Sequence, residues 1–124
     1  MNILVIEDED CNYFLIEGLL QVTLQKDFQI KRISSFTEAL GFDYTDFKLI
    51  IMDLHLPISY DDKEQVSPMQ FYQHIRKLSN IPIIFWTGSK YESIKEYVSE
   101  DKNAYYVAKH NAESIIDLIS TIIK

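Results

Sequence analysis

The stretch LIIMDLHLP, residues 49–57, places an aspartate, Asp53, directly after four apolar residues. An apolar run this short does not make a helix and is typical of a strand that is buried on both faces of a parallel sheet. Three further runs have the same character: Ile3 to Ile6, Ile83 to Trp86 and Tyr105 to Ala108. The run from Ile30 to Ile33 is a weaker fifth candidate. The sequence therefore predicts five short strands, and Asp53 ends the third.

Helical periodicity fills the segments between these runs. It is clearest from Ser114 to Ile123, where apolar residues recur at the spacing of one helix face. Four other segments are expected to be helical: Tyr13 to Leu24, Thr37 to Phe42, Met69 to Leu78 with Pro68 as a start signal, and Ser93 to Ser99. Strands that alternate with helices predict an α/β fold, a parallel sheet with five helices on its two faces.

Size and charge limit the class of protein. The chain has 124 residues, 47% of them hydrophobic, which suits one domain spanning residues 1–124. A formal net charge of −7 argues against nucleic-acid binding, which depends on clustered Lys and Arg. No apolar run has the length of a membrane span, and the first residues do not resemble a secretory leader, so a cytoplasmic location is expected. The lone Cys11 cannot close an intramolecular disulfide and is expected to lie at least half-buried in the first helix.

Reactive side chains follow four of the predicted strands. Glu7 and Asp8 follow the first strand, Asp53 the third, Thr87 the fourth and Lys109 the fifth. In an open α/β sheet, ligands bind outside the carboxyl ends of the strands. We therefore expect these side chains to meet in one crevice.

Carboxylates brought together repel one another unless a cation lies among them. The sequence has no Cys and His cluster of the kind that zinc favours, whereas carboxylate oxygens suit Mg2+. With the charge screened, one carboxylate can attack a phosphoryl group and form an aspartyl phosphate, while Lys109 and Thr87 hold the phosphoryl oxygens.

Four motifs in this order resemble the receiver domains of two-component response regulators along essentially the whole chain. They are ILVIED (3–8), LIIMDLHLP (49–57), IIFWTG (83–88) and YYVAK (105–109). The resemblance implies a flavodoxin-like, doubly wound five-stranded parallel sheet of order 2-1-3-4-5 with five helices on two faces. It also implies that Asp8 and Asp53 bind Mg2+ directly, that Glu7 helps through water, and that the backbone carbonyl of His55 completes the protein ligands.

By the same resemblance, Asp53 is the phosphoacceptor, and a histidine kinase or histidine phosphotransfer protein is the donor. The domain is then not a conventional enzyme but catalyses its own phosphorylation and dephosphorylation. Thr87 and Tyr106 are the implied switch residues. A downstream protein or output domain is the implied target, and the last two helices with the last strand are the implied output or homodimer face.

The sequence also departs from the family pattern. The loop after Pro57 lacks the usual glycine and is extended by the polar stretch from Ser59 to Ser67, and His110 stands where the family has proline. These departures keep open a phosphorylation-independent, receiver-like binding module. A small phosphohydrolase of the haloacid-dehalogenase type is a second alternative. A flavodoxin is disfavoured because the acidic residues 7–10 would repel its phosphate.

Overall fold

The chain forms one five-stranded parallel sheet. The computed structural model describes residues 1–24, 27–34, 46–53, 68–88, 95–109 and 111–123. The strands follow the order β2-β1-β3-β4-β5, and all neighbours are parallel. Their bounds are β1 (Asn2–Ile6), β2 (Gln29–Ile33), β3 (Phe47–Met52), β4 (Ile83–Thr87) and β5 (Ala104–Ala108). The predicted sheet and its order are confirmed.

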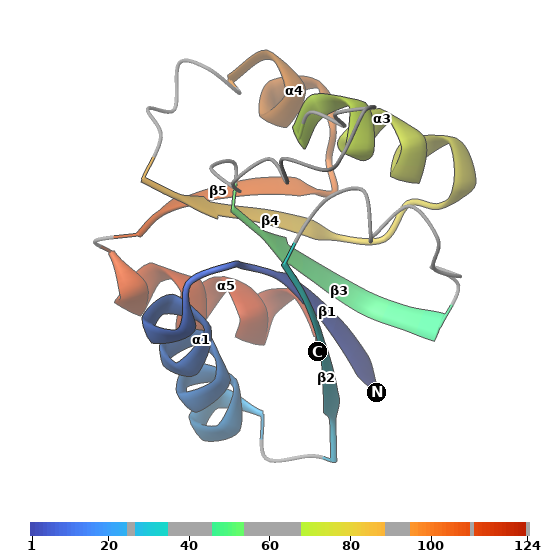
Figure 1. The fold of residues 1–124 in the computed structure, drawn as a ribbon. Helices are drawn as coiled ribbons and strands as arrows, with labels where there is room; N and C mark the ends of the chain where they lie inside the picture. The colour runs from blue at the N-terminus through green and yellow to red at the C-terminus, as the bar shows by residue number, and fades with distance from the viewer. Residues whose placement is uncertain (25–26, 35–45, 54–67, 89–94, 110, 124) are drawn as a thin grey trace, which may run out of the picture.

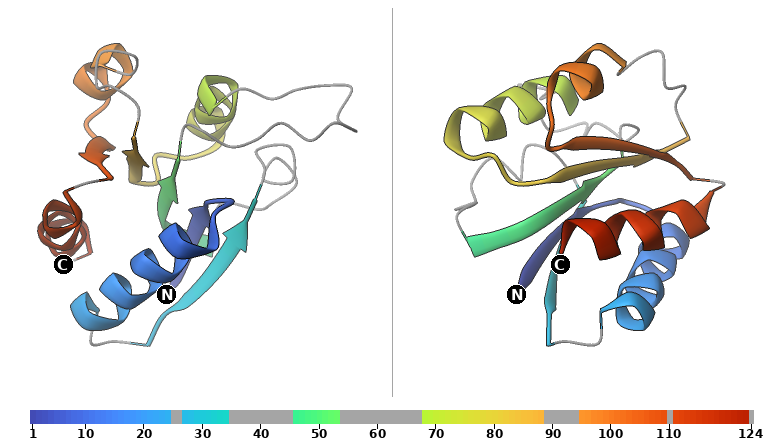
Figure 2. Two further views of the ribbon diagram at one scale, coloured as in Figure 1. Left: turned by 60° about the vertical axis from the view of Figure 1, so that its left-hand side comes forward. Right: turned by 180° about the vertical axis from the view of Figure 1, so that it is seen from behind.

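Helices cover both faces of this sheet (Figure 1). The described residues contain α1 (Asp10–Thr23), α3 (Pro68–Leu78), α4 (Lys95–Glu100) and α5 (Ala112–Ile122). Helices α1 and α5 lie on one face and α3 and α4 on the other, as the view from behind in Figure 2 also shows. The helix expected from Thr37 to Phe42 lies outside the described residues, so four of the five predicted helices are found. None of these four has the length and apolar character needed to cross a bilayer.

The central strands are buried on both faces, which explains their unbroken apolar runs. Side chains alternate between two cores. In β1, Leu4 and Ile6 pack into the core under α3, and Ile3 and Val5 pack into the core under α1 and α5. The same alternation divides β3 and β4. The carboxyl edge of the sheet is therefore where their next residues can leave the apolar interior.

Helix α1 departs from the sequence prediction in its start and in its exposed residues. It begins at Asp10, three residues before Tyr13. Cys11 is exposed, so the expectation that it is at least half-buried is wrong. The physical reason is that α1 has a second apolar stripe, including Phe14 and Val22, which are exposed while Ile16 and Leu20 face the core. Periodicity alone does not decide which stripe is buried.

An ion pair fixes α3 against the amino ends of β4 and β5. The Arg76 guanidinium pairs with Asp101, and Tyr72 donates a hydrogen bond to the same carboxylate oxygen. Arg76 also donates to the carbonyls of Ile81 (2.7 Å) and Asn103 (3.0 Å), which precede β4 and β5. Burial, and then the hydrogen bond to Asp101, raise the pKa of Tyr72 to about 12. This cluster holds α3 to both strands at the edge opposite their carboxyl ends.

The orientation of α1 predicts unequal effects of the same substitution at two of its leucines. Leu20 is fully buried, whereas Leu15 is 43% exposed. Leu20→Ala should lower the free energy of unfolding by about 2–5 kcal/mol, because it leaves a cavity. Leu15→Ala should change it by less than about 1 kcal/mol. Urea unfolding measures both, and equal losses would mean that α1 is turned differently.

The Asp101 ion pair predicts a pH-dependent stability. Burial opposes ionisation of Asp101, but hydrogen bonds from Tyr72 and Arg76 outweigh it and hold the pKa of this carboxyl below its ordinary 3.8. The folded-state pKa is depressed, so the stabilisation is present above the unfolded pKa and lost as pH falls through the folded pKa. Asp101→Asn should therefore be less stable than wild type at pH 7.

The difference should shrink below about pH 4 as the wild-type carboxylate becomes protonated. Urea unfolding at several pH values measures this difference. The exposed Asp117 on α5 provides the control substitution, Asp117→Asn. A stability difference that does not depend on pH would contradict the assignment.

Candidate functional site

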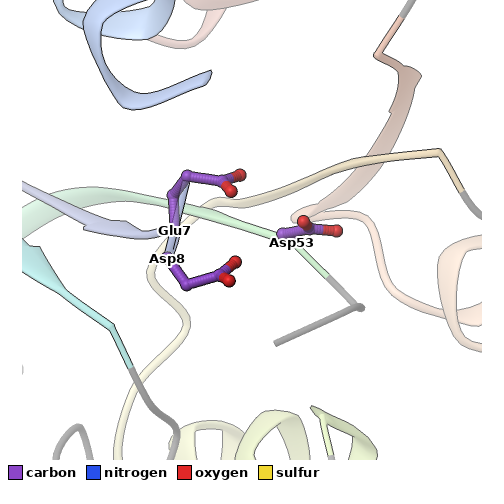
Figure 3. A group of neighbouring side chains, drawn as sticks. All are labelled: Glu7, Asp8 and Asp53. Carbon is purple, nitrogen blue, oxygen red and sulfur yellow. The ribbon is translucent and has the colours of Figure 1, made fainter. Parts of the chain in front are cut away.

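Three carboxylates meet at the carboxyl edge of the sheet. Glu7 and Asp8 follow β1, and Asp53 follows β3, the neighbouring strand. One carboxylate oxygen from each lies within 4.8 Å of the others, and in Figure 3 the side chains of Glu7 and Asp8 both extend toward Asp53. The Asp53 N–H donates to the Ile6 carbonyl (3.1 Å), so backbone pairing sets the two strand ends at the same height. The structure thus brings together the three acids that the sequence predicts to meet.

Two of these three carboxylates are almost completely buried. Glu7 is 1% exposed and Asp53 is 4% exposed, whereas Asp8 is half-buried. Burial raises the pKa of Glu7, although hydrogen bonds from the Glu9 backbone and Lys109 act in the opposite direction. A buried acid of this kind favours a neighbouring cation.

Lys109 supplies one cation to the cluster. Its ammonium nitrogen lies 2.8 Å from Asp53 Oδ2 and 3.1 Å from Glu7 Oε2, and 5.3 Å from the centre of the Trp86 ring. Burial alone would lower the pKa of Lys109, but its hydrogen bonds to Asp53 and Glu7 raise it above the ordinary value. Lys109 therefore stays charged, yet one ammonium does not neutralise three carboxylates.

The donor set fits a hard divalent cation. All three side chains offer oxygen, the ligand type that Mg2+ and Mn2+ prefer. Glu7 Oε2 is buried, and the Lys109 ammonium that it contacts at 3.1 Å is shared with Asp53. A cation near Glu7, Asp8 and Asp53 would compensate the remaining negative charge. The carbonyl of His55, which the resemblance adds as a ligand, lies outside the described residues.

Thr87 lies at the same edge of the sheet, and Tyr106 lies on the neighbouring strand β5. Thr87 is the last residue of β4 and is fully buried, and its carbonyl accepts the Lys109 N–H at 3.1 Å. Tyr106 is half-buried on β5 and packs against the core on the side of α3 and α4. His110 and the stretch from Ser59 to Ser67 lie outside the described residues.

Comparisons with solved structures identify the fold. A response regulator receiver domain from Clostridium thermocellum superposes with a TM-score of 0.72 at 22% identity, covering 98% of this chain and 93% of that one. The regulatory domain of MrkE from Klebsiella pneumoniae gives a TM-score of 0.75 at 18% identity, with 99% and 95% covered. The Mn(2+)-bound form of response regulator Rcp1 gives 0.70 at 20% identity, with 98% and 90% covered. The chain has the receiver-domain fold.

No protein-family model and no curated sequence matches the chain. The likeness to receiver domains therefore rests on three-dimensional structure, because the three structures named above share only 18–22% of their sequence with this chain. The receiver fold places the carboxyl ends of β1 and β3 side by side, and those ends carry the acidic residues of this chain.

Sequence reasoning missed one charged residue beside this receiver-fold site. Arg32, in β2, donates hydrogen bonds to the backbone carbonyls of Glu7 and Asp8, both at 3.2 Å. It also pairs with Asp10 at 2.8 Å. The only signal in the sequence is a charged residue near the carboxyl end of a predicted strand, next to Ile33.

The excess negative charge predicts that Glu7→Gln raises the melting temperature in metal-free buffer. Glutamine keeps an oxygen for the Glu9 N–H and removes a buried charge, and Lys109 retains Asp53 as its partner. We expect a rise of a few degrees at pH 7. Added Mg2+ should then stabilise wild type more than the variant.

Glu9→Gln makes the same charge change two residues away on an exposed side chain and serves as the control. Thermal unfolding followed by circular dichroism measures all three proteins, with EDTA and with Mg2+. A lower melting temperature for Glu7→Gln in EDTA would mean that the ion pair with Lys109 stabilises the fold more than burial of the charge destabilises it.

Proposed function

We propose that the protein is a phosphoacceptor receiver that takes up a phosphoryl group on Asp53. The observation that supports this proposal is the setting of Asp53 in a receiver fold. It is buried at the carboxyl edge of the sheet, beside two other carboxylates and 2.8 Å from the Lys109 ammonium. A cation-binding cluster next to a lysine is suited to phosphoryl transfer, because that chemistry needs mainly positioning and charge neutralisation.

In the proposed reaction, a carboxylate oxygen of Asp53 attacks the phosphorus of a phosphohistidine on a histidine kinase or phosphotransfer protein. A P–O bond forms, the P–N bond breaks, and the histidine nitrogen keeps the electron pair and takes up a proton. Lys109 exchanges its contact with Asp53 Oδ2 for one with a phosphoryl oxygen, and the Thr87 hydroxyl donates to another. Hydrolysis later restores the free carboxylate, so the domain assists its own modification and its own reset.

A divalent metal ion is part of the proposal. Asp8 and Asp53 would bind Mg2+ directly and Glu7 through water, and the bound ion would offset charge on the phosphoryl oxygens. The donor set supports this assignment, and so does the Mn(2+)-bound form of Rcp1, which shares the fold.

The signal would leave the site through Thr87 and Tyr106. When Thr87 turns toward the phosphoryl group, Tyr106 can occupy the space behind it, and the two positions form a two-state element. The surface built from α4, β5 and α5 would then bind a downstream protein or output domain, or a second copy of the chain. We place this signalling in the cytoplasm, where a histidine kinase presents its phosphorylated domain.

The test is phosphorylation by a small-molecule donor. Wild type incubated with phosphoramidate and Mg2+ should gain one labile phosphoryl group by intact mass, and EDTA should prevent the gain. Asp53→Asn should gain none, because an amide is not a nucleophile here. Asp27→Asn, at an exposed residue with the same change of charge, should behave as wild type.

Two results would contradict the proposal. Repeated turnover of a phosphate ester would favour the haloacid-dehalogenase-type hydrolase. A wild type that gains no phosphoryl group from phosphoramidate or from a kinase, while Asp53→Asn still supports signalling, would favour the phosphorylation-independent binding module.

A further inference from the structure

The side chain of Arg32, in the neighbouring strand β2, holds the loop that joins β1 to α1. Arg32 Nε donates to the Glu7 carbonyl at 3.2 Å, and Arg32 Nη2 donates to the Asp8 carbonyl at 3.2 Å. Arg32 Nη1 pairs with Asp10 Oδ1 at 2.8 Å, and the guanidinium carbon lies 4.5 Å from the centre of the Tyr13 ring. One guanidinium thus connects β2, the acidic loop and the first turns of α1.

The two carbonyls belong to the residues whose carboxylates form the acidic cluster. Each carbonyl lies in a planar peptide group, so these hydrogen bonds restrain the two successive peptide planes that meet at the Asp8 Cα, and with them the backbone from which the Glu7 and Asp8 side chains project. A planar fork of N–H donors is suited to two successive carbonyls, whereas a lysine ammonium is a point charge on a flexible stem. With its side chain 25% exposed, Arg32 makes these contacts in a partly desolvated setting where hydrogen bonds are stronger.

The charge of Arg32 acts in the opposite direction. A positive charge beside a cation site weakens metal binding by Coulomb repulsion. Asp10 offsets this charge because it pairs with the guanidinium at 2.8 Å. Arg32 therefore has a geometric effect that favours metal binding and a charge effect that Asp10 reduces.

We propose that Arg32 is a positioning residue that preforms the divalent-cation site through the Glu7 and Asp8 carbonyls, with Asp10 as its counter-charge. This inference rests on the part of the proposed function that assigns a metal to the acidic cluster. It does not require that Asp53 be phosphorylated.

Magnesium affinity tests the proposal, by titration followed through Trp86 fluorescence and by calorimetry. Arg32→Met and Arg32→Lys should each raise the Kd for Mg2+ by about 10-fold, the lower end of the range for residues that orient metal ligands. Arg32→Lys is the decisive variant because it keeps the charge and loses the planar fork. Asp10→Asn, which leaves the guanidinium charge uncompensated, should raise the Kd by a smaller factor.

Lys48→Met is the matched control. Lys48 is exposed in β3, five residues before Asp53 and roughly 16 Å away along the strand, and its loss changes the net charge as Arg32→Met does. Its Kd should equal that of wild type. Melting temperatures in EDTA, with titrations well below them, ensure that every variant is folded when its affinity is measured.

The outcomes separate this inference from the proposed function. If Arg32→Met binds Mg2+ as tightly as wild type or more tightly, charge dominates and the positioning role is wrong. If Arg32→Lys binds Mg2+ with wild-type affinity, the planar guanidinium is not needed and the proposal also fails. A wild type that binds Mg2+ but gains no phosphoryl group would overturn the proposed function and leave the role of Arg32 to be decided by the Kd values.

Discussion

The pairing of β1 with β3 is the constraint on which the site depends. Ile6 lies opposite Met52, so the next residues of the two strands, Glu7 and Asp53, emerge side by side. Both strands are covered on both faces, so carboxylates that follow them meet at an edge where water is scarce. Like charges are thereby held close together, so the cations beside them are needed to offset the repulsion between the carboxylates.

The two cations around the acidic cluster differ in kind. The Lys109 ammonium contacts the carboxylate oxygens of Asp53 and Glu7, so it competes with, and can be displaced by, other charged groups at those oxygens. Arg32 instead contacts the backbone carbonyls of Glu7 and Asp8 and the carboxylate of Asp10. The ammonium of Lys109 is thus suited to exchanging partners among the side chains, whereas the guanidinium of Arg32 holds the backbone of the loop in place.

Much of the fold was predictable because buried parallel strands leave unbroken apolar runs, and the reactive residues stand directly after those runs. The strand order came from the resemblance to receiver domains, since periodicity carries no information on which strands are neighbours. The buried face of α1 was not predictable, because Cys11 lies on one of two apolar stripes. The contacts of Arg32 were hidden for another reason: they join residues 24 and 25 positions apart, and their acceptors are carbonyls that every residue has.

The Arg76 and Asp101 ion pair limits how the sheet can move. It holds the amino ends of β4 and β5, while the Lys109 N–H to Thr87 bond joins the same two strands at their carboxyl ends. Strands tied at both ends do not slide past each other without breaking one of these ties. Any rearrangement at the carboxyl ends of β4 and β5 is thus taken up more easily by side-chain rotation than by sliding of these two strands, which serve together as a fixed frame of reference.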